Sequence, residues 1–177
     1  AIGGVGLIED FTTAAAPVFA AEGETIVLVG ETKGHLGQSL YLREIIGQEI
    51  GSPPPVDLEA EKRNGDFVRE QITGGTVGAC NDVSDGGVLV CVAEMAIKGG
   101  IGATLQVPES VQGHTIPAHA WLFGEDQGRY VLTTEDAEGL LAAAEKAGVP
   151  AMQIGISGGQ GLSLLGGTKE TALKALR

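Results

Sequence analysis

CNDVSDGGVLVCVAEMAIK, residues 80–98, is the stretch that we expect to organise the fold. It passes from the end of an expected strand, through a polar turn with two glycines, into residues 88–97, which are almost wholly apolar. A helix without a polar face must be buried, and a β-sheet is the partner that we expect for it. Burial of the helix would fix its N-terminus and, with it, the side chains of the turn.

The turn carries Asp82, Ser84 and Asp85, followed at once by Gly86 and Gly87. Helix N-termini present unpaired N–H groups and a partial positive charge. Paired carboxylates beside such a terminus could hold Mg²⁺ together with a phosphate, which makes Asp82 and Asp85 candidate metal ligands. The alternative is that Ser84 or Asp85 only caps the helix.

Charge and composition narrow the class of protein. The 177 residues include 29 glycines and 43% hydrophobic residues but only 4% aromatic ones, so small aliphatic side chains must fill the core. The net charge of −12 argues against non-specific nucleic-acid binding, which needs Lys and Arg, and against docking on anionic membranes. Two cysteines without a CxxC pattern, and no apolar run of membrane-spanning length, favour a reducing, cytoplasmic setting.

Hydrophobic patterns predict strands mixed with helices along the chain. Strands are expected at residues 2–8, 25–29, 76–81, 101–107, 129–134, 151–156 and 162–165. Helices are expected from residue 40 to about Glu49, at residues 57–72 and 88–97, after a cap at Thr134, and from about Thr168 to the last residue. The glycines at 158–161 are typical of a hairpin and imply an antiparallel pair. The fold class that we predict is α+β, a mixed sheet of about six or seven strands covered by helices.

Three local features of the expected helices follow from the same patterns. Asp57 should cap the helix that starts beside it. Gly99 and Gly100 should end the buried helix. Glu94 and Lys98 are four residues apart and should pair at its exposed end.

A glycine loop follows the strand at 25–29 and contains Gly34, His35 and Gly37. Strand, glycine loop and helix in that order can cradle a phosphate, although the Gly-Lys-Ser/Thr ending of a Walker A loop is missing. A plain tight connection is the alternative for the loop. His35 could take part in proton transfer, a common role of histidine, and a hydrogen-bonding surface histidine is the alternative there.

Glu125, Asp126 and Gln127 lie immediately before the strand at 129–134. Side chains held at the mouth of a strand are well placed to contact a ligand. A turn with a solvated acidic pair is the equally simple alternative.

Four stretches of the chain recur together in one known family. They are GGVGLIED at 3–10, GHLGQSLYL at 34–42, NDVSDGG at 81–87 and LFGEDQGR at 122–129. In this order they resemble the C-terminal part of phosphoribosylformylglycinamidine synthase, the ATP-dependent amidotransferase of purine biosynthesis. The PPPVDL and NGDFVR segments between them are similar to its small bacterial form, synthase subunit II, which belongs to the aminoimidazole ribonucleotide synthetase-related superfamily.

The resemblance implies a cytoplasmic carbon–nitrogen ligase. Formylglycinamide ribonucleotide, ATP and glutamine-derived ammonia would give formylglycinamidine ribonucleotide. ATP with Mg²⁺ would activate the formamide oxygen as an iminophosphate, and ammonia would displace phosphate. A glutaminase subunit would supply the ammonia, and a small accessory subunit would complete the complex.

The resemblance also implies that residues 1–177 are a single C-terminal domain of a larger multidomain synthase. It would pack against N-terminal and ATP-binding-type domains of the same chain. The absence of an initiator Met and a last predicted helix without a stop fit an excised fragment; removal of the Met is the competing explanation for the first. The family's catalytic histidine and main metal ligands would lie outside the fragment, so we expect no catalytic residue in it and no synthase activity from it alone.

Two positions depart from the family pattern. Asn81 stands where the family usually has His, so a proton-transfer role is not carried over to this position. Asp126 stands where the functional first-half copy of the motif has Ser, which fits a pseudo-symmetric, structural nucleotide site rather than the catalytic one. The expected lining of the ligand or nucleotide cleft is Gly34, His35, Gly37, Asp82, Ser84, Asp85, Gly86, Gly87, Glu125, Asp126 and Gln127.

Two other functions compete with this one. The first is a domain of another ATP-dependent enzyme of the same superfamily, which the substrate dependence of ATP turnover would reveal. The second is a non-catalytic interaction domain, which should self-associate when its interface is uncovered.

Overall fold

Seven strands form one mixed sheet in the described part of the chain, which confirms the predicted α+β class. The computed structural model describes residues 3, 5–8, 10–110, 113, 115–165, 170–172 and 175. The strand order is β2-β4-β1-β5-β3-β6-β7. The strands are β1 Thr25–Val29, β2 Ala79–Asp82, β3 Ala103–Leu105, β4 Tyr130–Thr134, β5 Ala151–Ser157, β6 Gly161–Leu164 and β7 Glu170–Ala172.

Strand β1 lies inside the sheet, as its almost continuously apolar sequence predicts. It pairs antiparallel with β4 on one side and with β5 on the other. In its register with β4, Thr25 lies opposite Thr134, and Val29 lies opposite Tyr130. The strand pair therefore has two distinct ends, one beside Tyr130 and one beside Thr134.

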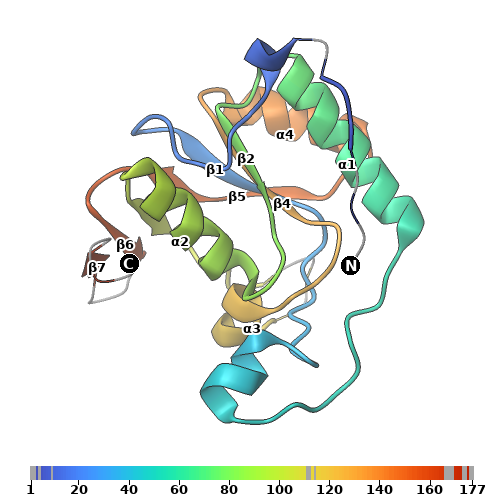
Figure 1. Cartoon of the computed structure of the whole chain (residues 1–177), viewed down its shortest axis with the longest axis vertical. Helices are drawn as coiled ribbons and strands as arrows, with labels where there is room; N and C mark the ends of the chain where they lie inside the picture. Colours follow the sequence, from blue (N-terminus) through green and yellow to red (C-terminus); the bar gives the residue numbers. More distant parts are fainter. Residues whose placement is uncertain are drawn as a thin grey trace.

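Helices cover both faces of the sheet, and in Figure 1 the central strands run between α1 and α4 on one side and α2 and α3 on the other. The helical segments are η1 Phe11–Thr13, a π-helical turn η2 Tyr41–Ile46, α1 Leu58–Thr73, α2 Gly87–Gly99, α3 Ala118–Phe123 and α4 Ala137–Lys146. Alternate residues of β1 pack against the helices on opposite faces of the sheet, because successive side chains of a strand point to opposite faces. Val27 and Val29 pack with α1 and α4, whereas Ile26 and Leu28 pack with α2 and α3.

The local predictions for two helices are confirmed. Val88 and Val92 on α2 are fully buried, so the apolar helix packs on the sheet as expected. Gly100 ends it in a left-handed conformation with φ of 69°. Lys98 Nζ lies 3.4 Å from Glu94 Oε2. Asp57 caps α1 by accepting bonds from two backbone N–H groups of its first turn. None of the helices in the described residues is long and apolar enough to cross a membrane.

The predicted hairpin at residues 158–161 is wrong, although the sheet has antiparallel pairs elsewhere. Strands β5 and β6 flank β3 instead of each other, and β3 runs antiparallel to β5 but parallel to β6. The glycines let the chain cross over β3, and a crossover has the same local composition as a hairpin turn.

The ends of the chain also differ from the prediction. Residues 3 and 5–8 form no strand, and the rest of the predicted strand lies outside the described residues. Glu170–Ala172 forms β7 against β6, so the last helix is wrong there; apart from residue 175, the remainder of it lies outside the described part. Short apolar runs do not separate helix from strand without their partners.

Two helix starts were misjudged as well. Asp136, not Thr134, caps α4: its Oδ1 accepts the Gly139 N–H at 2.9 Å. Helix α3 was not predicted, because its six residues are too few for a periodic pattern to appear.

Candidate functional site

Asp126 lies directly before β4 and holds the glycine loop in place. Its carboxylate accepts the backbone N–H groups of Lys33 at 3.1 Å, Gly34 at 2.9 Å and His35 at 3.3 Å. Only 6% of Asp126 is exposed. A buried carboxylate that accepts three backbone bonds fixes the path of the loop, so the structure brings two of the predicted motifs together.

Glu125 joins a third motif to the same place. One of its oxygens, Oε1, accepts the N–H groups of Leu40 and Gly86, each at 2.8 Å. Gly86 is the residue before α2, and Leu40 is the residue before η2. One carboxylate from the β4 approach therefore supplies acceptors to the N-termini of two helical segments that are far apart in the sequence.

Arg129 is buried beneath Asp126 and completes this network, which we call the carboxylate clamp (Glu125, Asp126 and Arg129). Its guanidinium donates to the carbonyl oxygens of Asp126 and Gly124 at 3.0 and 2.6 Å, and to Thr32 Oγ1 at 3.2 Å. An Asp126 oxygen lies 3.8 Å from Nη1. Burial lowers the pKa of Arg129, and the nearby Asp126 charge opposes that change. Sequence reasoning missed this residue, although a lone Arg before an apolar strand was a usable signal.

Close backbone contacts explain why glycine recurs in the three motifs. A Cβ added to Gly87 would lie 2.6 Å from the carbonyl oxygen of Gly124. A Cβ added to Gly124 would lie 2.9 Å from the Cα of Gly34. The three motifs thus meet backbone to backbone, and only residues without side chains allow that approach.

The turn before α2 does not use its own side chains as caps, which corrects the prediction for Ser84 and Asp85. Gly86 is the N-cap with φ of 81°, and α2 has no side-chain cap. A capping residue needs extended backbone to turn its oxygen toward the helix. The left-handed Gly86 replaces that geometry, and Glu125 supplies the missing acceptor instead.

Asp82, Ser84 and Asp85 are exposed on the surface of this turn. Among the described residues, no group of three or more His, Cys, Asp or Glu side chains is arranged to hold a metal ion. A Mg²⁺ site normally needs several oxygen ligands in near-octahedral order. Asp82 and Asp85 by themselves therefore do not fit a complete magnesium site.

His35 connects the glycine loop to the segment before α1. Its Nε2 lies 2.7 Å from the carbonyl oxygen of Ser52, so the ring serves as a hydrogen-bonding group. A Cβ added to Gly37 would overlap the same Ser52 oxygen. Gln38 has the one positive φ, 59°, of any described non-glycine residue, and its side chain donates to the carbonyl oxygen of Gly51. Such a backbone conformation is strained, so the contacts around Gln38 must hold the loop in it.

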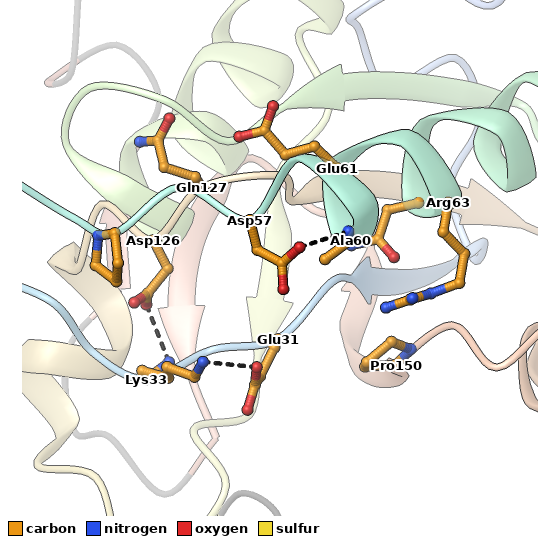
Figure 2. Close-up of a pocket in the computed structure, with 11 residues that line it drawn as sticks. Glu31, Lys33, Asp57, Ala60, Glu61, Arg63, Asp126, Gln127 and Pro150 are labelled. Carbon is orange, nitrogen blue, oxygen red and sulfur yellow. Dashed lines mark hydrogen bonds and ion pairs between the residues drawn. The ribbon is translucent and has the colours of Figure 1, made fainter.

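Figure 2 shows the pocket of about 140 Å³ that lies beside the clamp. Lys33 and Glu31 form an ion pair at 2.9 Å on one side, and the first turns of α1 form the other. Asn64, only 3% exposed, lines it with an Oδ1 that lacks a partner in the described residues. The pocket is lined by Glu31, Lys33, Pro55, Asp57, Ala60, Glu61, Arg63, Asn64, Asp126, Gln127 and Pro150.

The size of this pocket limits what it holds. Small-molecule sites usually span about 300–1,000 Å³, so it takes a small polar group or water rather than a whole nucleotide. Gln127 is exposed at its rim and donates to the backbone oxygen of Glu125 at 3.2 Å. The predicted cleft residues thus separate into the clamp, the glycine loop that it holds, the buried glycines at the start of α2, the exposed turn residues Asp82, Ser84 and Asp85, and Gln127 at the pocket rim.

The two cysteines are structural. Burial raises the pKa of Cys80 to about 11 and that of Cys91 to about 12. Both are free, and thiols with such pKa values stay protonated and unreactive near neutrality.

This geometry defines a class: an α+β domain whose mixed sheet holds a glycine loop and a helix N-terminus together through carboxylates at a strand mouth. The model for the family "AIR synthase related protein, C-terminal domain" matches residues 21–165. The chain belongs to this family.

Relatives with curated names cover almost the whole chain. It is 58% identical over 179 residues to the phosphoribosylformylglycinamidine synthase subunit PurL of Rhodopseudomonas palustris strain TIE-1, covering 99% of the chain and 24% of that protein. It is 55% identical to the same subunit of Methylocella silvestris, covering 93% and 22%. The chain therefore spans about a quarter of the length of these relatives.

Solved structures share the fold. Thermotoga maritima PurL complexed with FGAR matches with a TM-score of 0.75 at 21% identity, over 94% of this chain and 30% of that one. The Escherichia coli hydrogenase maturation protein HypE matches with a TM-score of 0.61 at 24% identity, over 90% and 52%. At these identities the likeness concerns the fold.

Proposed function

We propose that this chain is the C-terminal domain of a phosphoribosylformylglycinamidine synthase, the ligase that uses ATP and glutamine-derived ammonia to make formylglycinamidine ribonucleotide. The observation that carries the proposal is the 58% identity to a PurL subunit along 99% of the chain. Solved structures of T. maritima PurL with ATP and with FGAR support ATP and this substrate as ligands of the whole enzyme. Mg²⁺ is proposed only for the whole enzyme, because Asp82 and Asp85 form no complete site.

The role that we assign to this domain is to form one wall of a shared cleft. Asp126 fixes the glycine loop and Glu125 fixes the start of α2. Both carboxylates are occupied by backbone groups, so they act as positioning residues. Ser84 and Asp85, which precede Gly86 in the chain, are exposed, so another domain can contact them. Catalytic groups would come from that other domain.

Exposed apolar side chains support contact with other domains of the same protein. Ile45 and Ile46 on η2 are 68% and 48% exposed, and Leu58 at the start of α1 is 75% exposed. Figure 1 shows the segment that leads from η2 to α1 at the edge of the domain. Such surface is normally covered by a partner. The partners that we propose are the N-terminal and ATP-binding-type domains of the synthase chain.

The proposed complex includes a glutaminase subunit and a small accessory subunit. The solved structure of PurLQS from T. maritima supports assembly with further subunits. The location that we propose is the cytoplasm, which suits the two free thiols.

The test compares the full-length protein that contains this sequence with the 177-residue chain. Each is supplied with ATP, Mg²⁺, ammonium and formylglycinamide ribonucleotide, and amidine formation is followed. We expect turnover by the full-length protein and none by the chain alone. Robust amidine formation by the chain alone, or ATP turnover in the full-length protein that ignores this substrate, would contradict the proposal.

A further inference from the structure

A second pocket, of about 590 Å³, lies at the opposite end of β4 from the carboxylate clamp. Thr134, the last residue of β4, forms part of its wall, whereas the clamp precedes Tyr130 at the other end. The remaining walls come from the end of α1, the loop at 74–78 and the first turns of α4. The volume lies within the range of about 300–1,000 Å³ that is usual for small-molecule sites.

Glu24 lines this pocket and carries a buried carboxylate oxygen that no described residue pairs. Only 7% of the residue is exposed, and Oε2 has no hydrogen-bond partner in the described part of the chain. The backbone of Glu24 is fixed, because its N–H donates to Ser157 Oγ at 3.1 Å and its carbonyl oxygen accepts the Ser157 N–H at 2.9 Å. A Cβ added to Gly78 would overlap Oε1, so the carboxylate lies directly against bare backbone.

Two hydroxyl groups that line the pocket, those of Thr76 and Thr134, are already committed. Thr76 Oγ1 donates to the carbonyl oxygen of Gln71 at 3.0 Å and to its Oε1 at 2.8 Å. Thr134 Oγ1 donates to the carbonyl oxygen of Thr76 at 2.8 Å. These hydroxyls therefore cannot compensate Oε2, and an uncompensated buried carboxylate is costly.

The charged residues that line the pocket indicate which kind of group would pair with the Glu24 carboxylate. Glu24, Glu135 and Asp136 line the pocket, and no Lys, Arg or His is among the described residues around it. The described residues also offer no cluster suited to a metal ion. An organic cation that carries N–H donors suits such walls, because it supplies a counter-charge and hydrogen-bond donors to the Glu24 carboxylate.

We propose that this pocket binds a guanidinium or primary ammonium group, with the Glu24 carboxylate as its counter-ion. The group is carried either by a free small molecule or by a Lys or Arg side chain of another part of the protein. The site is separate from the clamp, and the proposal does not depend on the synthase assignment.

The test is a titration of the 177-residue chain with agmatine, which carries a guanidinium and an ammonium group, followed by amide chemical shifts of Glu24 and Gly78. Tetramethylammonium is the control ligand, because it carries charge without N–H donors. Glu24→Gln is the test variant and Glu22→Gln the matched control, since Glu22 is an exposed acid two residues away. We expect Glu24→Gln to weaken agmatine binding at least tenfold and Glu22→Gln to change it less than twofold.

The thermal transition of the ligand-free chain gives an independent readout. Glu24→Gln should raise Tm, because it removes an unpaired buried charge, and should abolish the further rise that agmatine produces in the wild type. A lower Tm in Glu24→Gln, equal binding of tetramethylammonium, or no agmatine shifts at Glu24 and Gly78 would each overturn the proposal.

Repeating the titration on the full-length protein identifies the source of the cation. Binding in both proteins indicates a free small molecule. Binding in the chain but not in the full-length protein indicates that a Lys or Arg side chain from elsewhere in the protein already fills the pocket.

Discussion

A buried carboxylate lies near each end of β4, but only at one end do described residues donate hydrogen bonds to it. Beside Tyr130, Asp126 accepts three backbone N–H groups and Glu125 accepts two. Beside Thr134, Glu24 keeps a buried oxygen without a partner in the described residues. At the first end, backbone N–H groups of the chain itself pair the carboxylates. At the second end an outside group is needed as the partner of Glu24, because burial of an unpaired acceptor is costly. Carboxylates thus position the glycine loop and the start of α2 at one end, and a carboxylate recognises the proposed cation at the other.

Asp126→Asn should give the largest effect at the satisfied end. The variant leaves the buried Arg129 without its nearest negative charge and turns an NH₂ group toward backbone N–H donors. We expect a loss of about 3–5 kcal/mol in the free energy of unfolding, the usual cost of breaking a buried pair. Urea-induced unfolding followed by circular dichroism measures it.

Gln127→Ala is the neighbouring control, since Gln127 is exposed and should change stability by no more than about 0.5 kcal/mol. Equal urea midpoints for Asp126→Asn and the wild type would show that the clamp does not hold the loop.

Glu125→Ala should have the next largest effect. It leaves the N–H groups of Leu40 and Gly86 without an acceptor, which should cost about 2 kcal/mol in total. Hydrogen exchange should also quicken at these two amides, which connects the loss to the starts of η2 and α2.

Glu125→Gln is the matched variant, because its amide oxygen can still accept both bonds. It should recover most of the stability that Glu125→Ala loses. If the two variants are equally unstable, the charge rather than the acceptor is what matters at Glu125.

Glu24→Gln should act with the opposite sign at the unsatisfied end. Removing the unpaired charge should raise the free energy of unfolding by about 1 kcal/mol. For a chain of this size that corresponds to a Tm increase of about 2–4 °C in differential scanning calorimetry. Glu22→Gln should leave Tm unchanged, and a Tm decrease in Glu24→Gln alone would erase the contrast between the two ends.

Between the two ends, Cys80 pairs with Leu132 in the middle of β4, and its thiol should affect stability only at high pH. The pKa values of Cys80 and Cys91 rise from 9.0 to about 11 and about 12. Above pH 9.0 the unfolded thiols lose protons that the folded protein retains, so stability should fall as pH rises from there toward 11 and 12. Unfolding curves between pH 8 and 11 test this, with no thiol contribution expected below the unfolded pKa.

The Cys80→Ala and Cys91→Ala double variant should lose this part of the decline. Thiol alkylation at pH 8 provides a second check, since both groups should react far more slowly in the native protein than in urea. Rapid native alkylation would contradict the raised pKa values of the two thiols.

Local patterns in the sequence were enough for much of the fold. The continuous apolar run at Thr25–Val29 predicted an inner strand, and the apolar sequence of α2 predicted a buried helix. Asp57 was predicted as the cap of α1 because a cap depends only on the residues within one helical turn. Features that depend only on neighbouring residues in the sequence could therefore be predicted from it.

The misjudged features depend on partners that are distant in sequence. The loop at 158–161 resembled a hairpin, but β3 inserts between β5 and β6. Ser84 and Asp85 resembled caps, but the acceptor for Gly86 is Glu125, 39 residues further along the chain. Local composition carries no information about which distant group arrives to satisfy a backbone N–H.

By itself, the sequence determined the α+β class, the positions of most strands and the four motifs that resemble the synthase family. Only the tertiary structure decided that Asp126 and Glu125 accept hydrogen bonds from backbone N–H groups, and that Glu24 Oε2 is buried without a partner among the described residues at the far end of β4. The physical reason is that a strand or helix follows from patterns that recur within a few residues. The role of a carboxylate depends instead on whether packing brings a donor within hydrogen-bonding distance of it.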